Sequence, residues 1–496
     1  MSDNGGTEGA RRGMAVVWLL AAVTAAALAV RLLAANNPLW VDEIFSLYFV
    51  QALRSPLQVF TQLHSDNNHY LNSLWMYALG PQQGAWMYRL PAVICGVLTV
   101  PAAYWSGARR GGGGTAAALV WAAMIAISEP LIVYSSEARG YAGAVLAAVA
   151  AFGATGRWVE GRDWRWGLAA GLIGVMGLLS QLTYAFVWVA LLVWTLAAVR
   201  REGARGGLRG GGQGRGWGEL ALMHGPVVAC GLILYEVNVR SMVLLGGPKV
   251  GPLSVVEHLI RVMAGWPGGS AAAADVMLLG VLVLVGAGVD WLRRRRQSVW
   301  IFYVVLVALP AGLLWFDPPT YLFPRYFLVL APFVYQLGAL LAVRGFQAAR
   351  WRVAAAGLMA AFVVGQAVLV ANFLRVGRGD PAAGVAYLAA HTSTAEIPIV
   401  SSRPQRLTIE LWYDQRMLPE GRSFEVVSDA AHGEAPWLLL EDVAVSEAPG
   451  TLNVQGSRWR KAAAWDSSDL SGQTWIVYRR ARAGVGSGAA SSRGGE

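Results

Sequence analysis

Two adjacent acids, Asp42 and Glu43, stand in the stretch WVDEIF about ten residues after a long apolar run ends. A carboxylate that faces an aqueous pocket can act as a general base towards a hydroxyl or an amine. A helix is expected from Asp42 to Arg54, and aspartate is also a frequent N-cap at such a place. The sequence therefore leaves two roles open for Asp42, base or cap, and makes Glu43 a supporting acid.

Further ionisable and aromatic groups stand in the same connection and in later connections between apolar runs. Such groups cost on the order of several kcal/mol near membrane depth unless they are paired or line a wet cavity, so they are functional candidates by default. They are His69, Tyr70, Glu137, Arg139, Tyr141, Arg261, Arg325 and Tyr326. Arginines can hold a phosphate as a leaving group. With a base, and with apolar helices around a lipid tail, they meet the requirements for moving a sugar from a polyprenyl phosphate to an acceptor.

Each candidate also has a purely structural interpretation. Glu137 and Arg139 are two residues apart and could form a local ion pair or begin a helix. Arg325 could anchor the end of a span at the membrane surface. His69 could be an interfacial side chain, and Glu43 a solvated acid. These alternatives stay open at the level of single residues.

The elements that must position these groups are membrane-spanning helices. The chain has 496 residues, 55% of them hydrophobic and 14% charged, and its mean hydropathy is +0.44, which predicts an all-α polytopic membrane bundle. About eleven runs are long enough to cross a hydrocarbon core of about 30 Å. They are 14–33, 88–108, 115–133, 141–157, 166–180, 182–199, 219–237, 271–292, 299–316, 325–343 and 353–373. A cleaved signal peptide is the alternative for the first run.

Arginine is concentrated in every second connection between these runs. By the positive-inside rule those connections and the N-terminus are cytoplasmic, and the remaining connections lie outside. The net charge of +10 is thus mainly a topology signal, and no nucleic-acid partner is expected. Asn68 to Leu79 is apolar, but a crossing there would reverse the sides of all later arginine connections. We therefore interpret it as an amphipathic helix on the outer surface.

The composition divides the chain into three parts. Residues 1–373 are expected to form the transmembrane catalytic domain, with surface helices in its first outer loop, 34–87. Residues 374–483 are expected to form a small outer α/β domain, and 484–496 a disordered tail. Within the small domain we expect strands at 397–401, 437–441 and 474–480 and a helix at 404–414.

Several stretches carry a resemblance to a known family. They are WVDE (40–43), DNNHYLNSLWMYALG (66–80), YRLPAVICGVLTVPAAYWSGARR (88–110), YSSEARGY (134–141) and TYLFPRYFLVLAPF (320–333). Together they resemble the membrane glycosyltransferases of the GT-C superfamily, and more narrowly the family 39 type. Relatives of that type include protein O-mannosyltransferases and the aminoarabinose transferases that act on lipid A. The similarity covers the first 160 residues well and is thinner through the middle.

The resemblance implies roles for the candidate residues. The acid at the position of Asp42 is the family's proposed base, and Glu137 corresponds to a further acid, so Asp42, Glu43 and Glu137 form the catalytic set. Basic residues such as Arg139 and Arg325 would bind the donor phosphate. The other substrate-binding candidates are His69, Tyr70, Tyr141, Arg261 and Tyr326.

The chain also departs from the family pattern. Many relatives have His-Pro-Pro before the surface helix, whereas this chain reads Asn68-His69-Tyr70. Some members bind a divalent cation. This sequence has no strong ligand spacing such as HExxH, so its metal dependence stays open.

The expected function is transfer of a hexose or pentose from a polyprenyl phosphate, with inversion, on the outer face of the plasma (inner) membrane. The acceptor would be a glycolipid, a polysaccharide or a protein. Two other classes stay open. A lipid-linked-sugar transporter or flippase would need polar residues through the depth of the bundle, and a catalytically silent relative would bind a cell-envelope partner.

Overall fold

The computed structural model describes residues 4–109, 113–204, 213–244, 246, 251–268, 271–316, 319, 321–428, 435–441, 443–454, 456–468 and 470–481. The predicted disordered tail, 484–496, lies outside these residues. The chain divides into two compact units. The first comprises Met1–Asn37 and Phe45–Arg375, and the second comprises Pro38–Ile44 and Val376–Glu496.

The first unit is a bundle of apolar helices. Within the described residues, eight helices are long and apolar enough to cross a membrane. They are α1 (Asn4–Ala35), α5 (Ala85–Gly107), α8 (Tyr141–Gly161), α10 (Ala185–Ala204), α11 (Gln213–Val237), α13 (Ala271–Arg294), α15 (Ala331–Gln347) and α16 (Arg352–Val376). Three shorter apolar helices, α6 (Thr115–Ile127), α9 (Trp164–Ser180) and α14 (Trp300–Phe316), occupy the other three predicted runs. The predicted polytopic α-bundle is thus confirmed.

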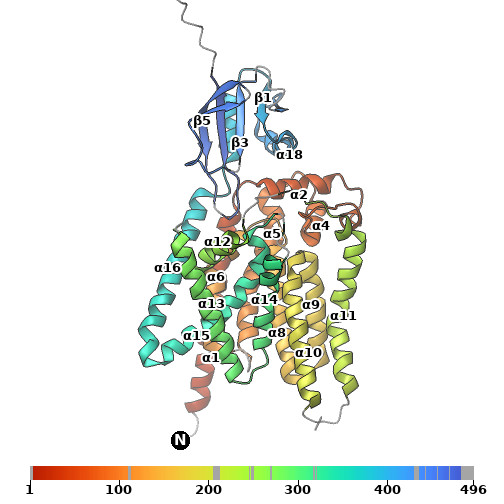
Figure 1. Ribbon diagram of the computed structural model, residues 1–496, viewed down its shortest axis with the longest axis vertical. Helices are drawn as coiled ribbons and strands as arrows, with labels where there is room; N and C mark the ends of the chain where they lie inside the picture. The colour runs from red at the N-terminus through yellow and green to blue at the C-terminus, as the bar shows by residue number, and fades with distance from the viewer. Residues whose placement is uncertain are drawn as a thin grey trace, which may run out of the picture. The chain divides into compact units, whose positions relative to one another are not determined.

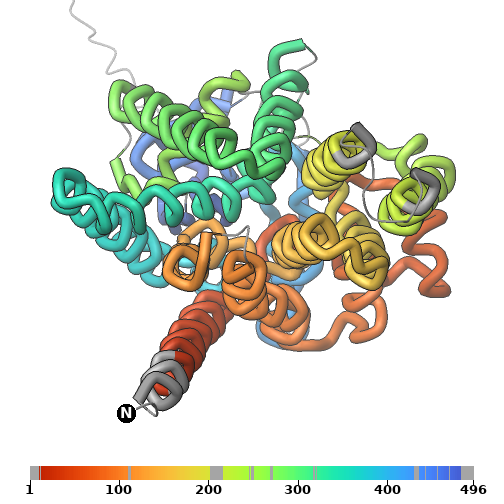
Figure 2. The backbone as a smooth tube through the Cα atoms, turned by 90° about the horizontal axis from the view of Figure 1, so that it is seen from below, coloured from red at the N-terminus to blue at the C-terminus, as the bar shows by residue number. Residues whose placement is uncertain are grey.

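The centre of the bundle is built on α8. Figure 1 and Figure 2 show α8 within the bundle, and it packs against both α5 and α9. Its sequence, YAGAVLAAVAAFGATG, is mostly small residues, which allow the backbones of neighbouring helices to approach closely. At Gly153 an added Cβ would lie 2.2 Å from the Ser106 hydroxyl of α5. The small residues of α8 therefore set the spacing of the central helices.

Short helices gather where α1, α6, α9 and α11 end. They are α2 (Val41–Gln51), α3 (Gln58–Thr61), α4 (Tyr70–Leu79), α7 (Glu129–Tyr134), η2 (Leu182–Tyr184), η3 (Val239–Ser241), α12 (Pro252–Ala264) and η4 (Pro324–Leu330). We call this the α4 end of the bundle. Helix α4 has ten residues, about 15 Å at 1.5 Å per residue, which is too short to cross a membrane. It is therefore a short helix between spans, as the sequence predicted. At the opposite end, η5 (Ala349–Trp351) joins α15 to α16.

The second unit contains a mixed six-stranded sheet of order β2-β1-β3-β6-β5-β4. Its strands are β1 (Glu396–Ser401), β2 (Ser423–Ser428), β3 (Trp437–Glu441), β4 (Thr451–Val454), β5 (Ser457–Trp465) and β6 (Trp475–Arg480), with helices α17 (Pro381–Ala390), α18 (Pro404–Asp414) and η6 (Gln415–Met417). Strand β1 runs parallel to β2 and β3, and the other pairs are antiparallel. The predicted small α/β domain is confirmed, with its three predicted strands and the helix at 404–414.

This sheet domain contains a buried acid. Asp414, the last residue of α18, is 2% exposed, and its Oδ1 has no hydrogen-bond partner among the described residues. Burial raises the pKa of this carboxyl well above its usual range, and the Glu410 charge raises it further, while Arg416 opposes the shift. A carboxyl with a raised folded-state pKa favours folding below its unfolded pKa, and that contribution is lost as pH rises through the folded pKa.

We therefore expect Asp414→Asn to stabilise the sheet domain at neutral and alkaline pH and to make little difference near pH 4. In the wild type the free energy of unfolding falls by up to about 1.4 kcal/mol per pH unit between the two pKa values of this one group. Hydrogen exchange of the α18 peptide in the full chain, followed from pH 4 to 9, measures this. The exposed acid Glu420 provides a control. An equal pH response in Asp414→Asn and Glu420→Gln would contradict the assignment.

Candidate active site at the α4 end of the bundle

The two acids that attracted attention in the sequence begin α2. Glu43 is completely buried, and its Oε2 accepts a hydrogen bond from the backbone N–H of Trp40 at 3.1 Å. An acid at the third helical position that bonds back to the N-cap amide forms half of a capping box. Glu43 therefore stabilises the start of α2. Asp42 lies in the same first turn and is partly exposed; both acids belong to the second compact unit.

In the first unit, the turn between α7 and α8 carries Glu137 and Arg139. Both side chains are buried, Glu137 completely and Arg139 to all but 4%. Arg139 Nη2 donates to Asn67 Oδ1 at 2.6 Å, and its Nε donates to His69 Nε2 at 3.1 Å. Its guanidinium also lies over the Tyr141 ring, 5.1 Å from the centroid. The structure thus brings three predicted residues together: His69, Arg139 and Tyr141.

The contact with Arg139 fixes the charge and tautomer of His69. A guanidinium has only donors, so the Nε2 that accepts from it must be unprotonated, and the ring proton sits on Nδ1. Burial holds the pKa of His69 well below its usual range, and the charges of Arg139 and Arg325 lower it further, against a smaller opposing effect of the Ser180 carbonyl. His69 is therefore neutral and accepts a hydrogen bond from Arg139.

Aromatic rings enclose this cluster. The His69 and Tyr141 rings meet edge to face with centroids 5.1 Å apart, and Tyr134 lies 5.3 Å from Tyr141. Arg325, in η4, is 8% exposed, and its guanidinium lies 3.8 Å from the centroid of the Phe323 ring. Such cation–aromatic contacts hold guanidinium groups where water is scarce. Tyr326 follows in η4 and is partly buried.

Two predicted substrate-binding residues have other contacts. The Tyr70 hydroxyl donates to Asn238 Oδ1 at 3.0 Å, and its ring stacks on Phe60 with centroids 5.4 Å apart. Tyr70 thus ties α4 to the segment after α11. Arg261 lies in the last turn of α12, and its Nη1 donates to the Gly268 carbonyl at 3.4 Å.

Other polar residues complete the cluster, among them Asn67, which the sequence placed among the polar groups of the first outer loop without a specific role. Asn67 accepts from Arg139 and donates through Nδ2 to the Ser46 hydroxyl of α2 at 3.0 Å. Asn72 of α4 donates to the Ala138 carbonyl in the same turn as Arg139. The run DNNHY held a signal for Asn67, since an amide next to an acid and close to a histidine near membrane depth requires partners. Ser46 carries no such signal.

Gly140 makes the close packing of this turn possible. A Cβ at this position would lie 1.7 Å from the Ser180 carbonyl oxygen at the end of α9 and 3.1 Å from His69 Cβ. Only glycine fits without moving α9 or His69.

Among the described residues, no group of three or more His, Cys, Asp or Glu side chains is arranged to hold a metal ion.

Comparison with known proteins identifies the fold. No protein-family model matches the chain, and no curated protein matches its sequence. ArnT from Cupriavidus metallidurans in the apo state is similar with a TM-score of 0.53 at 14% identity, over 94% of this chain and 98% of that one. Its structure bound to undecaprenyl phosphate gives 0.51 at 14% identity, over 94% and 97%. This likeness confirms the predicted resemblance to the GT-C membrane glycosyltransferases at the level of the fold.

A second neighbour is the archaeal oligosaccharyltransferase AglB from Archaeoglobus fulgidus, in complex with an inhibitory peptide and a dolichol-phosphate. Its TM-score is 0.47 at 13% identity, over 82% of this chain. This chain spans 60% of the length of that protein.

We expect Gly140→Ala to destabilise the protein by roughly 1–3 kcal/mol, the usual cost of overpacking, because the new methyl group must displace the Ser180 carbonyl. Thermal unfolding of the purified protein in detergent measures this as a lower Tm. Gly161, the last residue of α8, has no atom within 4 Å of an added Cβ and is the matched control. Gly161→Ala is expected to leave Tm unchanged or slightly higher. Equal Tm values for the two variants would contradict the close-packing argument.

Proposed function

We propose that this protein is an integral-membrane glycosyltransferase that moves a sugar from a polyprenyl-phosphate donor to an acceptor, with inversion at the anomeric carbon. The observation that carries the proposal is the buried cluster of charged residues at the α4 end of an apolar bundle, with Arg139, Arg325 and the acid Glu137. Arg139 is held there by Asn67 and His69, and both Arg139 and Arg325 act electrostatically on His69. Fixed cations next to lipid-facing helices suit a ligand that is both anionic and apolar.

The cluster supports phosphate as the leaving group. Because its donors are already oriented, little reorganisation is needed as negative charge develops on the departing phosphate. Arg139 is held by two hydrogen bonds and an aromatic ring, so the orientation of its guanidinium is fixed. Because His69 is neutral, its protonation does not change the charge of the cluster near neutral pH.

Asp42 is the proposed general base. In the reaction, its carboxylate takes the proton of the acceptor hydroxyl or amine as that atom attacks the anomeric carbon. The bond from carbon to the phosphate oxygen breaks, and polyprenyl phosphate leaves with the electron pair. Two observations support a distinct role for Asp42: Glu43 already fills the capping position, and Asp42 is four residues before Ser46 in α2, so the two share one helix face. Glu137 is proposed as the second acid.

The ArnT likeness supports the donor class. One of its structures holds undecaprenyl phosphate, a polyprenyl phosphate, and this chain matches nearly its whole length. We infer that the present chain takes a donor of the same chemical class at the outer face of the plasma membrane. A glycolipid, a polysaccharide or a protein is the acceptor.

Asp42→Asn is expected to lower the transfer rate at least roughly 100-fold, the range that a general base contributes. The assay uses membranes that contain the full-length variant and a panel of radiolabelled hexosyl and pentosyl polyprenyl phosphates. Product analysis should show the opposite anomeric configuration to the donor. Asp290→Asn, which removes an exposed acid of α13 that pairs with Arg293 and Arg294, is the control. Undiminished transfer by Asp42→Asn would exclude this aspartate as the base.

A second variant in the same assay tests the phosphate role. Arg139→Lys keeps the charge but loses the fork that reaches Asn67 and His69 together, so the donor KM should rise about tenfold or more. If the wild type transfers sugar from none of the donors, the proposal that the protein is a glycosyltransferase is wrong. Movement of labelled donor across sealed vesicles would then favour a flippase.

The α4 end is proposed to lie outside the cell. A cysteine at Gln82, an exposed residue between α4 and α5, should react with a membrane-impermeant maleimide in intact cells. A cysteine at Ala349, exposed at the opposite end between α15 and α16, should react only after permeabilisation. Both tests use a background in which Cys95 and Cys230 are replaced by serine. The reverse pattern would place the site on the cytoplasmic side.

A further inference from the structure

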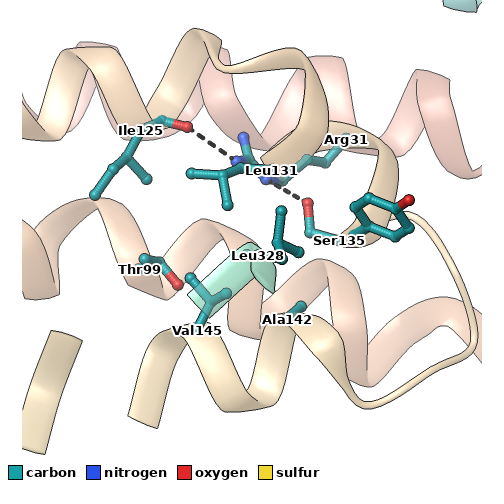
Figure 3. Close-up of a pocket in the computed structure, with 10 residues that line it drawn as sticks. Arg31, Thr99, Ile125, Leu131, Ser135, Ala142, Val145 and Leu328 are labelled. Atoms are coloured by element: carbon teal, nitrogen blue, oxygen red, sulfur yellow. Dashed lines mark hydrogen bonds between the residues drawn. The ribbon is translucent and has the colours of Figure 1, made fainter. Parts of the chain in front are cut away.

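An arginine inside the first span is completely buried. Arg31 lies in α1, four residues before its end, and has no exposed surface. It faces a cavity of about 10 Å³, roughly the size of one water molecule. Figure 3 shows this cavity between Arg31, Thr99 of α5, Ser135 after α7, and Leu328 of η4. A charged side chain in such a place requires partners from the protein itself.

Part of the charge is satisfied by the end of α6. Arg31 Nη1 donates to the Ala126 carbonyl at 3.2 Å, and Nη2 donates to the Ile125 carbonyl at 3.3 Å. Both carbonyls belong to the last turn of α6, where the helix has no amide partners for its oxygens and where its dipole is negative. A third bond joins Nη1 to the Ala27 carbonyl of the same helix at 3.2 Å. Arg31 is thus a C-cap supplied to α6 by α1.

The remaining bond reaches the turn that carries the candidate site. Arg31 Nε donates to the Ser135 hydroxyl at 2.8 Å, and that hydroxyl donates onward to the Ile132 carbonyl at 3.2 Å. Ser135 is the C-cap residue of α7, and Glu137 and Arg139 lie two and four residues after it in the same turn. Every acceptor that Arg31 contacts among the described residues is a neutral oxygen. Its contacts therefore fix the relative positions of α1, α6 and α7 through one rigid guanidinium group.

The third neighbouring helix leaves space for this pair. A Cβ at Gly96 of α5 would lie 2.3 Å from Ser135 Cβ and 2.8 Å from Arg31 Nε. The contact between Arg31 and Ser135 therefore fits only because α5 has no side chain there. Helices α1, α5, α6 and α7 all meet at this one bond.

We propose that Arg31 is a positioning residue, which fixes the turn of Ser135 to Gly140 and so sets the place of Arg139 and Glu137. Its effect on transfer rests on the proposed function, because it acts through the donor-binding arginine. Its effect on the order of the turn does not. Lysine has one point of charge instead of a planar fork and cannot reproduce the contacts to α6 and Ser135 together.

The test compares Ser135→Ala, Arg31→Met and Arg31→Lys with a control at the same cavity. Thr99 also lines it, but its hydroxyl donates only within its own helix, to Cys95 at 2.7 Å. In detergent, amide exchange of the peptide 129–141 should become at least roughly tenfold faster in all three variants, because each loses a charge-assisted contact. Exchange in α8 to α10 should be unchanged, and Thr99→Val should match the wild type throughout.

Kinetics separate positioning from a purely structural role. Ser135→Ala, which leaves the cap on α6 intact, should raise the donor KM at least fivefold with kcat within about threefold, while Thr99→Val changes neither. Wild-type exchange rates at 129–141 in Ser135→Ala would overturn the inference, even if Arg31→Met fails to fold. Faster exchange with an unaltered KM would overturn the link to the donor. Absence of any wild-type transfer would reject the proposed function, and the exchange data would still decide whether Arg31 orders the turn.

Discussion

Buried polar groups at the α4 end of the bundle must find their partners within the protein, and much of the site geometry follows from that constraint. The helices that end there leave carbonyls and amides without partners within their own helix, and apolar surroundings make each unsatisfied group costly. Long side chains from other helices supply the missing bonds. Arg89 of α5 donates to the carbonyls of Ala35 and Asn37 after α1, at 2.8 and 2.6 Å. Gln366 of α16 accepts from the Glu129 amide of α7 and donates to two carbonyls of α12.

These exchanges give the site its rigidity. Each arginine or glutamine that caps the end of another helix fixes two or three elements relative to one another with a single side chain. The Ser128 and Tyr335 hydroxyls share a hydrogen bond of 2.9 Å, and Tyr335 also donates to the Met263 carbonyl of α12. The turn with Arg139 is thus surrounded by elements whose ends are bonded to one another. Preorganisation of this kind is what a fixed cation needs in order to stabilise a departing phosphate.

The sequence predicted the elements far better than the contacts. Hydrophobic runs and arginine-rich connections predicted the eleven apolar helices and the short helix α4, because span length and charge are local properties. In the sheet domain, IPIVS and WIVYRR predicted β1 and β6, whereas β5, SRWRKAAAW, lacks β-branched residues and was missed. The roles of Asn67, Gly140 and Arg31 depend on which helix ends meet, and one sequence does not contain that information. Arg31 had a local signal, an arginine within an apolar run, but the run was interpreted as a span or a signal peptide and the arginine was given no role.

Several arginines at the two ends of the bundle differ in burial and in the partners that they contact. At the end opposite α4, Arg293 and Arg294 are 65% and 77% exposed and pair with Asp290, contacts that are screened and worth little. At the α4 end, Arg31, Arg89, Arg139 and Arg325 are all buried. Two arginines depart from this division: Arg109 is buried at the opposite end beside Glu160 and the Phe152 ring, and Arg240 of η3, at the α4 end, is 68% exposed. The exposed class fits the orientation of helices in a bilayer, where only position along the chain matters. The buried class is tied to carbonyls, amides and rings at defined distances, so its members are not interchangeable with lysine. Arg31 and Arg89 close helix ends through backbone carbonyls, whereas Arg139 and Arg325 are held by side chains and rings of the candidate site.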